Sequence, residues 1–429
     1  MLDSIRIAFL SEHASPLSLL GGVDAGGQNV YVDEVSRNLG TLGHTVDVFT
    51  RRDNPDVPDI VQWSPGVRIV HIAAGPPEFI PKDDVWPLMP AFRDGIAAFM
   101  LRNARTYDVI HSNFWMSGWV AAQLKPLLRV PVIHIFHAMG LTKRRHQGSS
   151  DTSPGERMTV EREVIARVDA LIAQCPAEEH ELIDDYAAEA GKVALIPSAV
   201  NVDTYRPIQQ AEARHALGIN PDVPLVVYVG RMLPRKDVRN VIRAVALMVE
   251  REDVPVELLL VGGESAEPDP VLTPEIGVLR SLARDLGIPD RVRFTGKRQP
   301  DVLCYYYSAA DVVVTTPWYE PFGLTPLEAM ACGRPVVGSA VGGITFTIAD
   351  GETGYLVPPR DPEALADRLR FLLIHRDMCR LMGGRARARI EEEFTWVRAA
   401  RNTTALYRQV LGAQEIESHA VSTACGGGS

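Results

Sequence analysis

The stretch that decides the fold is LVVYVGRMLPRKDVRNVIRAVALMVEREDVPVELLLV, residues 225–261. Its ends, Leu225–Val229 and Glu257–Val261, are short apolar runs of the length of a strand. Between them, from Val238 on, apolar residues recur at every third or fourth position, which predicts an amphipathic helix. A strand, a helix and a second strand in this order predict two parallel strands joined by a helical crossover.

The same alternation continues on both sides of this unit. It predicts two sets of six strands, over Ile5–Leu10, Thr45–Phe49, Val67–Ile72, Val109–His111, Val132–Phe136 and Ala170–Ala173, and over Leu225–Val229, Glu257–Val261, Val292–Thr295, Asp311–Thr315, Val336–Gly338 and Tyr355–Val357. Such alternation indicates parallel sheets wrapped by helices. We therefore predict an α/β fold of two doubly wound, Rossmann-like domains.

The boundary between the domains is expected where both periodicities lapse, in IPSAVNVDTYRPI at residues 196–208. The predicted organisation is an N-terminal domain over 1–200, a linker over 201–208, a C-terminal domain over 209–393, a helix over 394–415 that packs back on the N-terminal domain, and a disordered tail over 416–429.

Composition excludes several classes of protein. The chain has 429 residues, of which 46% are hydrophobic and 23% charged, and a net charge of −10, so we expect no nucleic-acid partner. No apolar run approaches the ~18 residues of a membrane-spanning helix, and the N-terminus lacks the long apolar region of a signal peptide. The five cysteines are scattered without CxxC spacing, which indicates neither a zinc site nor a disulfide framework. We therefore expect a cytoplasmic protein.

Two segments of the C-terminal half carry candidate chemistry. The strand Leu225–Val229 runs into a loop with Arg231 and Lys236, a pair of cations that suits a diphosphate or, equally, forms ordinary solvent-facing charges. In TTPWYEPFGLTPLEAMACGRPVV, Glu320 lies in a loop and Glu328 on the following helix. Two carboxylates so spaced could hold hydroxyls at opposite ends of an elongated ligand, and a buried Glu328 requires a partner.

The N-terminal half offers weaker signals. GGVDAGGQNVYVDEV places Gly21, Gly22, Gly26 and Gly27 between the first strand and a helix, without the GxGxxG spacing of dinucleotide-binding loops. His137 lies where a strand meets its loop. Alone, these residues are most simply a glycine-rich turn and a core histidine.

Together, these features resemble the family-4 retaining glycosyltransferases of the GT-B fold. The resemblance rests on Gly26-Gly27, HSNFWMSGW at 111–119, His137, the GR and RK pairs of 230–236, and Glu320-x7-Glu328 within EPFGLTPLEA. Within the family, DAGGQNVYV, DVFTRR, IAAGPPE and SGWVA are most similar to inositol-3-phosphate glycosyltransferases of mycothiol biosynthesis, and next to sucrose-phosphate synthases. The resemblance implies two domains facing across a cleft and a hexosyltransferase that moves a sugar from a nucleotide-diphosphate sugar, with UDP favoured, to an acceptor hydroxyl.

The resemblance also implies roles for single residues. Arg231 and Lys236 would neutralise the departing diphosphate without a metal, since the chain contains no Asp-x-Asp, and no cofactor is expected. Retention would follow from front-side displacement, in which the donor phosphate takes the acceptor proton. The implied donor-binding residues are Gly26, Gly27, Arg231, Lys236, Glu320, Phe322, Gly323, Leu324 and Glu328, and the implied catalytic residues are His137, Arg231, Lys236 and Glu320.

The chain also departs from the family that it resembles. Asp237 stands where the family usually has glycine, and we expect it to cap the helix from Val238. The positions that hold the acceptor phosphate in the inositol-phosphate enzymes, a lysine, a tyrosine, a threonine and an arginine, are here Lys82, Phe114, Ala138 and Arg157. The two cations remain and both hydroxyls are lost, so we expect an anionic acceptor, whereas the lost hydroxyls argue against inositol phosphate itself.

Two other functions stay open at this point. Non-hydrolysing nucleotide-sugar 2-epimerases share the two-domain architecture and need no acceptor, and a non-catalytic nucleotide-sugar-binding protein would bind without turnover. The expected partners are a nucleotide-sugar donor and a small-molecule or glycan acceptor, and a homodimer is possible.

Overall fold

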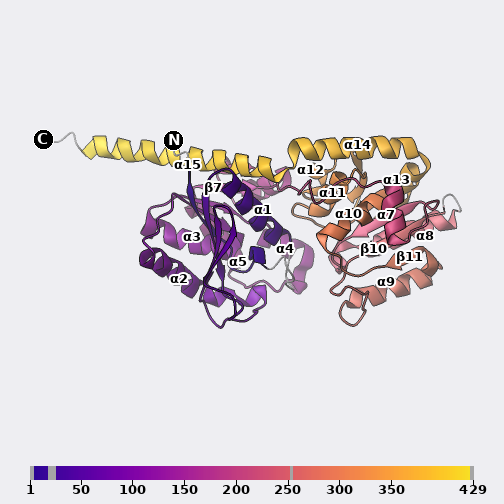
Figure 1. Cartoon of the computed structure of the whole chain (residues 1–429), viewed down its shortest axis with the longest axis horizontal. Helices are drawn as coiled ribbons and strands as arrows, with labels where there is room; N and C mark the ends of the chain where they lie inside the picture. The colour runs from indigo at the N-terminus through magenta and orange to yellow at the C-terminus, as the bar shows by residue number, and fades with distance from the viewer. Residues whose placement is uncertain (1–3, 18–25, 252–254, 426–429) are drawn as a thin grey trace. The chain divides into compact units, whose positions relative to one another are not determined.

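The structure, a computed structural model, describes residues 4–17, 26–251 and 255–425, and from residue 414 on it describes the backbone alone. The chain forms two compact units (Figure 1). The N-terminal unit comprises Met1–Pro197 together with Trp396–Ser429, and the C-terminal unit comprises Ser198–Thr395.

The N-terminal unit contains an eight-stranded sheet in the order β3-β4-β2-β1-β5-β6-β7-β8, parallel except for the pairing of β3 with β4. Its strands are β1 (Arg6–Leu10), β2 (Thr45–Arg51), β3 (Ile60–Ser64), β4 (Val67–Ile72), β5 (Val109–Asn113), β6 (Val132–Ile135), β7 (Ala170–Ala173) and β8 (Val193–Leu195). The six predicted strands are present. The edge strands β3 and β8 were not predicted, because both lie at the rim of the sheet and are only partly buried.

Helices cover both faces of this sheet. They are α1 (Gly27–Thr41), α2 (Met89–Arg102), α3 (Phe114–Leu128), α4 (Gly140–Gln147), α5 (Arg157–Arg167), α6 (Pro176–His180) and α15 (Trp396–Cys425). Alternate residues of β1 lie on opposite faces of the sheet. Ala8 and Leu10 join the core with α2, α3 and α5, whereas Phe9 stacks on His111 with ring centroids 4.4 Å apart.

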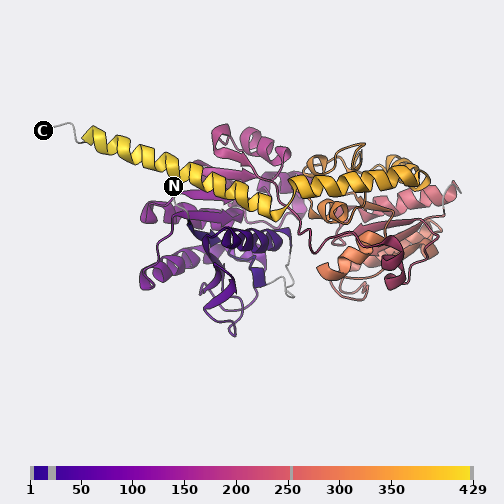
Figure 2. The same cartoon turned by 45° about the horizontal axis from the view of Figure 1, so that its top comes forward.

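Helix α15 lies along α1, as Figures 1 and 2 both show, and it contacts His111 of β5. The Tyr407 hydroxyl lies 2.7 Å from Nδ1 of His111, and Thr404 Oγ1 lies 3.1 Å from Nε2 of His44. The backbone is helical to Cys425, so residues 416–425, predicted as a disordered tail, are helical in the structure. No glycine or proline interrupts the chain between Ala413 and Cys425, and a helix can therefore continue there.

The C-terminal unit contains a fully parallel six-stranded sheet in the order β11-β10-β9-β12-β13-β14. Its strands are β9 (Leu225–Val229), β10 (Glu257–Val261), β11 (Val292–Phe294), β12 (Val312–Thr315), β13 (Val336–Ser339) and β14 (Gly354–Val357). Its helices are α7 (Gln210–Leu217), α8 (Val238–Glu250), α9 (Pro274–Asp285), α10 (Pro300–Ala309), α11 (Leu324–Ala331), α12 (Ile344–Thr347), α13 (Pro362–Ile374) and α14 (Arg376–Glu393). Two doubly wound α/β units are thus confirmed.

Both sheets reverse their strand order at one point. In the N-terminal unit β1 lies between β2 and β5, and in the C-terminal unit β9 lies between β10 and β12. Loops that leave the carboxyl ends of such neighbouring strands diverge and expose backbone groups, which is where open α/β sheets bind ligands. The candidate residues after β5, β9 and β12 lie at these two positions.

Candidate active site

The loop after β9 begins with a glycine that its geometry requires. Gly230 has φ +155°, and a Cβ there would lie 2.9 Å from the hydroxyl of Tyr228. The next residue, Arg231, is exposed, and Lys236 ends the 3₁₀ turn Pro234–Lys236. The ammonium of Lys236 forms an ion pair with Oε2 of Glu320. The two residues predicted to bind the diphosphate, Arg231 and Lys236, therefore share one loop. Lys236 also contacts Glu320, the residue predicted to bind the donor sugar.

The loop after β12 is held against the loop after β9. Trp318 N donates to Arg235 O over 2.9 Å, and Thr316 Oγ1 donates to Asp237 O over 3.1 Å. Gly323 has φ +91°, and α11 begins at the next residue, Leu324. The first backbone amides of a helix have no partner within the helix, so those of Leu324 and Thr325 at the start of α11 suit an anion.

A second glycine makes room for Glu320, and sequence reasoning missed it. A Cβ at Gly342, where φ is +45°, would lie 2.1 Å from Glu320 O. The neighbouring Gly343 N donates to the same carbonyl over 3.0 Å. The sequence did contain a signal for this close approach. Gly342 and Gly343 follow shortly after β13, where a parallel strand leads into a loop that can face a ligand.

Glu328 on α11 is half-buried, and its carboxylate has hydrogen-bond partners. Its Oε2 accepts a hydrogen bond of 2.6 Å from the Tyr307 hydroxyl, and the Tyr205 hydroxyl donates to the same carboxylate. Burial raises the pKa of the Glu328 carboxyl, while the two hydroxyls counteract that rise. Sequence reasoning identified the acid but not the tyrosines, because Tyr205 lies in the stretch predicted to be a linker.

In the N-terminal unit, His137 follows β6 and is fixed by Asn113 at the end of β5. His137 Nε2 lies 3.0 Å from Asn113 Oδ1, and Asn113 Nδ2 donates to Leu10 O over 3.1 Å. The His137 ring meets the Tyr31 ring edge-on at 4.8 Å. Burial, aided by His111, lowers the pKa of His137 to about 3, so the imidazole is neutral at pH 7. Because Asn113 Oδ1 can only accept, Nε2 carries the hydrogen and Nδ1 is the acceptor.

The first predicted glycine loop is described only in part. Gly21 and Gly22 lie outside the described residues. Gly26 is the N-cap of α1, which starts at Gly27; its N–H donates to Asn29 Oδ1 over 3.1 Å, and both glycines are exposed. They occupy the carboxyl end of the N-terminal sheet.

The four predicted acceptor residues meet around one aromatic ring. Lys82 Nζ lies 5.4 Å from the centroid of the Phe114 ring, and Arg157 Cζ lies 5.1 Å from it. Arg157 Nη2 donates to Ala138 O over 2.6 Å. Phe114 and His137 have φ +71° and +62°, a strained backbone of about 1–3 kcal/mol each that persists only where the surroundings impose it, often at functional sites.

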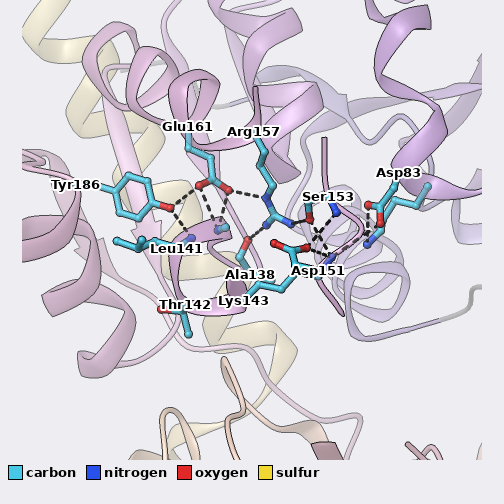
Figure 3. Close-up of polar contacts among 12 residues, drawn as sticks. Asp83, Ala138, Leu141, Thr142, Lys143, Asp151, Ser153, Arg157, Glu161 and Tyr186 are labelled. Carbon is cyan, nitrogen blue, oxygen red and sulfur yellow. Dashed lines mark hydrogen bonds and ion pairs between the residues drawn. The ribbon is translucent and has the colours of Figure 1, made fainter. Parts of the chain in front are cut away.

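Figure 3 shows how Arg157 is held. Its side chain is 2% exposed, Nε donates to Glu161 Oε1 over 2.8 Å, and Nη1 donates to Ser153 Oγ over 3.2 Å. Glu161 is fully buried and also accepts from Gly140 N and from the Tyr186 hydroxyl. Arg157 is therefore committed to its own unit, whereas Lys82, 34% exposed, is the accessible cation of the pair.

Two further properties complete the description. Among the residues that the structure describes, no group of three or more His, Cys, Asp or Glu side chains could hold a metal ion. No helix in the described ranges is long and apolar enough to cross a membrane. The first of these findings does not test the prediction that the enzyme works without a metal ion.

Comparison with known proteins shows the class. The family described as "Glycosyl transferases group 1" matches residues 209–389, and "Glycosyltransferase Family 4" matches residues 25–204. The chain belongs to this family of glycosyltransferases, and its two parallel-sheet units are those of the GT-B fold.

Individual relatives show which glycosyltransferases this chain is similar to. D-inositol 3-phosphate glycosyltransferase from Corynebacterium diphtheriae is 37% identical over 94% of this chain and 94% of its own length, and the enzyme of that name from Kribbella flavida is 38% identical over 94% and 95%. Among solved structures, sucrose-phosphate synthase from Thermosynechococcus elongatus is 35% identical, with a TM-score of 0.84, over 95% of this chain and 100% of that one. Anabaena Alr3699/HepE, in complex with UDP and glucose, is 19% identical over 94% of this chain and 100% of that one; its TM-score of 0.72 shows the shared fold.

The resemblance, the fold and the enzyme class predicted from the sequence are thus confirmed. The comparisons give no support to the epimerase or to the non-catalytic binding protein. The roles of individual residues, and retention of configuration, stay predictions. Asp237 is the N-cap residue of α8, as the sequence indicates, although it adopts left-handed dihedrals and its side chain makes no capping hydrogen bond.

Proposed function

We propose that this glycosyltransferase transfers a sugar from a UDP-sugar to a hydroxyl of a phosphorylated small molecule, in the cytoplasm, with retention of configuration and without a metal ion. The observation that carries the donor half is the arrangement of Arg231, Lys236 and Glu320 at the strand-order reversal of the C-terminal sheet. Two cations and the first amides of α11 suit a diphosphate, and the carboxylate suits sugar hydroxyls.

The remaining donor contacts follow from the same chemistry. The Glu328 carboxylate, positioned by Tyr307, accepts hydrogen bonds from the ribose hydroxyls. His137 accepts one through Nδ1 from a hydroxyl of the donor sugar, because its Nε2 is committed to Asn113. The neutral imidazole is suited to this role, since a protonated ring could only donate.

The proposal that the acceptor is phosphorylated rests on Lys82 and on the names of the similar proteins. Two of them are named for inositol 3-phosphate and one for the synthesis of sucrose phosphate, so a phosphorylated sugar or polyol recurs in the names of proteins similar to this chain. Lys82 offers a partly exposed ammonium beside Phe114, and the buried Arg157 lies on the same ring. The ammonium binds the phosphate, while the guanidinium shapes the site and contributes its field.

The experiment has two stages. A thermal-shift screen of UDP-, GDP- and ADP-sugars identifies the donor, because a ligand that binds only the native state raises the melting temperature. The preferred donor is then incubated with D-inositol 3-phosphate and with fructose 6-phosphate, and the configuration of any product is read by NMR. A UDP-sugar that stabilises the protein and a product of unchanged configuration are expected. Conversion of donor alone to an epimer, or binding without transfer to any sugar phosphate, would refute the proposal.

A further inference from the structure

A groove runs along the outer edge of the C-terminal sheet, between α9 and β11. It encloses about 550 Å³, and apolar residues form most of its wall, among them Pro270, Pro289, Val292 and Phe294. Sites for small molecules typically enclose roughly 300–1,000 Å³ and have mostly apolar walls with a few polar groups. The groove therefore has the size and the lining of a site for a small organic molecule.

This groove is separate from the candidate donor site. β11 is an edge strand of its sheet, whereas Arg231 and Glu320 follow the central strands β9 and β12. Pro289 lies directly before β11, so the groove extends to the amino end of that strand, while the candidate donor residues lie beyond the carboxyl ends of theirs. An occupant of the groove would therefore be a different molecule from the donor.

Two arginines on α9 give the groove its charge. Arg280 and Arg284 are one helical turn apart, and both line the groove. Arg280 Cζ lies 5.4 Å from the centroid of the Phe294 ring, and its Nη2 donates to Pro268 O over 3.3 Å, which orients the guanidinium. Among the residues that the structure describes, no carboxylate forms an ion pair with either arginine. Two like charges at this spacing repel each other, and a bound anion would remove that repulsion.

A glycine inside α9 keeps the groove open. Gly277 lines the groove and lies three residues before Arg280, on the same face of the helix. A Cβ there would meet one atom of the described residues within 4 Å, Pro270 Cβ at 3.5 Å, which is an ordinary contact. Neither a positive φ nor close packing thus requires glycine, although glycine destabilises a helix relative to alanine. What its missing side chain provides is space in the groove.

We propose that this groove binds a small phosphate monoester that carries an apolar ring. The terminal oxygens of the phosphate accept hydrogen bonds from Arg280 and Arg284, and the ring lies against Val292 and Phe294. A carboxylate has only two oxygens to share between two guanidiniums, so it fits the pair less well. The site is independent of the proposed function, because no residue assigned to the donor or to the acceptor lines it.

The test uses the full chain and 1-naphthyl phosphate as the probe, with binding followed by ligand-observed NMR. In parallel, 1-naphthol and inorganic phosphate each lack one half of the probe. Gly277→Leu fills the groove, and its matched control is Gly384→Leu on α14, where a Cβ would meet no described atom within 4 Å. Arg284→Ala removes one charge, and Arg385→Ala, at an exposed position on α14, is the control for that loss.

We expect 1-naphthyl phosphate to bind with a Kd on the order of 0.1–1 mM, and 1-naphthol and phosphate to bind at least about tenfold more weakly. Gly277→Leu should abolish binding without lowering the melting temperature, since leucine favours a helix more than glycine does. Arg284→Ala should weaken binding about tenfold. Four variants should bind the probe as the wild type does: Gly384→Leu, Arg385→Ala and, at the candidate donor and acceptor sites, Lys236→Ala and Lys82→Ala.

Three results would overturn the inference. Absence of binding to the wild type at millimolar probe would show that the groove takes no ligand of this class. Binding that persists in Gly277→Leu and is lost in Lys236→Ala or Lys82→Ala would place the probe at the proposed substrate sites, with the proposed function unaffected. A wild-type dimer, seen by analytical ultracentrifugation, that Gly277→Leu converts to a monomer would assign the groove to a second copy of the chain.

Discussion

Replacing Asp237 by glycine should stabilise the C-terminal unit. Asp237 has φ +50° and ψ +45°, the left-handed region, directly after Lys236 and before α8. It is 6% exposed, and burial raises the pKa of its carboxyl. Trp318 and the cations Arg243 and Arg360 counteract only part of that rise, and the side chain makes no capping hydrogen bond. Glycine adopts these dihedrals without a steric penalty and carries no charge to bury.

The expected gain is small and has a defined origin. Left-handed dihedrals cost an L-residue about 1–2 kcal/mol, and the greater flexibility of glycine in the unfolded chain returns about 0.5–1 kcal/mol of this. The net gain in the free energy of unfolding is on the order of 0.5–1 kcal/mol. For a domain the size of the unit Ser198–Thr395, this corresponds to about 2 °C in melting temperature.

Differential scanning calorimetry of three variants separates backbone from charge. Asp237→Ala removes the carboxylate but keeps the strain, so it should melt below Asp237→Gly. Asp237→Asn tolerates the left-handed region and removes only the charge. Arg129→Gly relieves a left-handed residue, φ +55°, at the end of α3, far along the chain from Lys236. Both Asp237→Gly and Asp237→Asn should lower the donor KM, because a negative charge next to Lys236 is lost, whereas Arg129→Gly should not.

The pH dependence has a definite sign. A carboxyl whose pKa is raised on folding destabilises the native state when it is ionised, and this penalty disappears below the unfolded-state pKa. The advantage of Asp237→Asn over wild type should therefore be full at pH 7 and shrink as the pH falls through the raised pKa of Asp237. A melting temperature of Asp237→Gly equal to that of Asp237→Ala would refute the argument from strain, and a pH-independent advantage of Asp237→Asn would refute the argument from burial.

Four other outcomes are expected. Arg231→Ala or Lys236→Ala should lower kcat by on the order of 10²–10³ with the fold preserved, because each removes a preorganised cation from developing diphosphate charge; near-normal turnover at saturating donor would remove that residue from the site. Excess EDTA should leave turnover unchanged, and complete, reversible loss would disprove metal independence. Lys82→Ala should raise the acceptor KM and leave the melting temperature unchanged, and this effect should weaken at high salt. Arg157→Ala should instead unfold the N-terminal unit more readily, by about 3–5 kcal/mol, because Glu161 is left buried without its cation; a stable variant with only a raised acceptor KM would assign the phosphate to Arg157.

The fold could be predicted from the sequence because periodicity and burial agree. The central strands β9 (LVVYV) and β12 (VVVT) of the C-terminal sheet are almost entirely apolar, as strands buried on both faces require. The two strands that were not predicted, β3 and β8, are only partly buried. Ile60–Ser64 pairs antiparallel at an edge, and Val193–Leu195 is a three-residue edge strand, so neither shows an uninterrupted apolar run of strand length.

The sequence could predict only those site residues whose position directly after a strand is visible in the local pattern. Arg231, Lys236 and Glu320 follow central strands, and that position is visible in the sequence. The partners of Glu328 and of Arg157 were not visible, because Tyr205, Tyr307 and Glu161 reach them through tertiary packing. Nor could the sequence show that Arg157, which matches a phosphate-binding arginine, has its guanidinium engaged by its own unit.

The Lys236–Glu320 ion pair indicates how the donor site can be stable before the donor arrives. Arg231 and Lys236 together would present two like charges at the end of one strand, which would repel each other without a ligand. Glu320 compensates Lys236 in the structure, so that Arg231 is the exposed charge. An ammonium has three donors, so Lys236 can keep Glu320 and still bind a phosphate oxygen, whereas Glu320 has lone pairs to spare for hydroxyls. Under the proposed function, the pair would link recognition of the sugar to recognition of the diphosphate, since each ligand group would be bound by a residue that the other helps to hold in place.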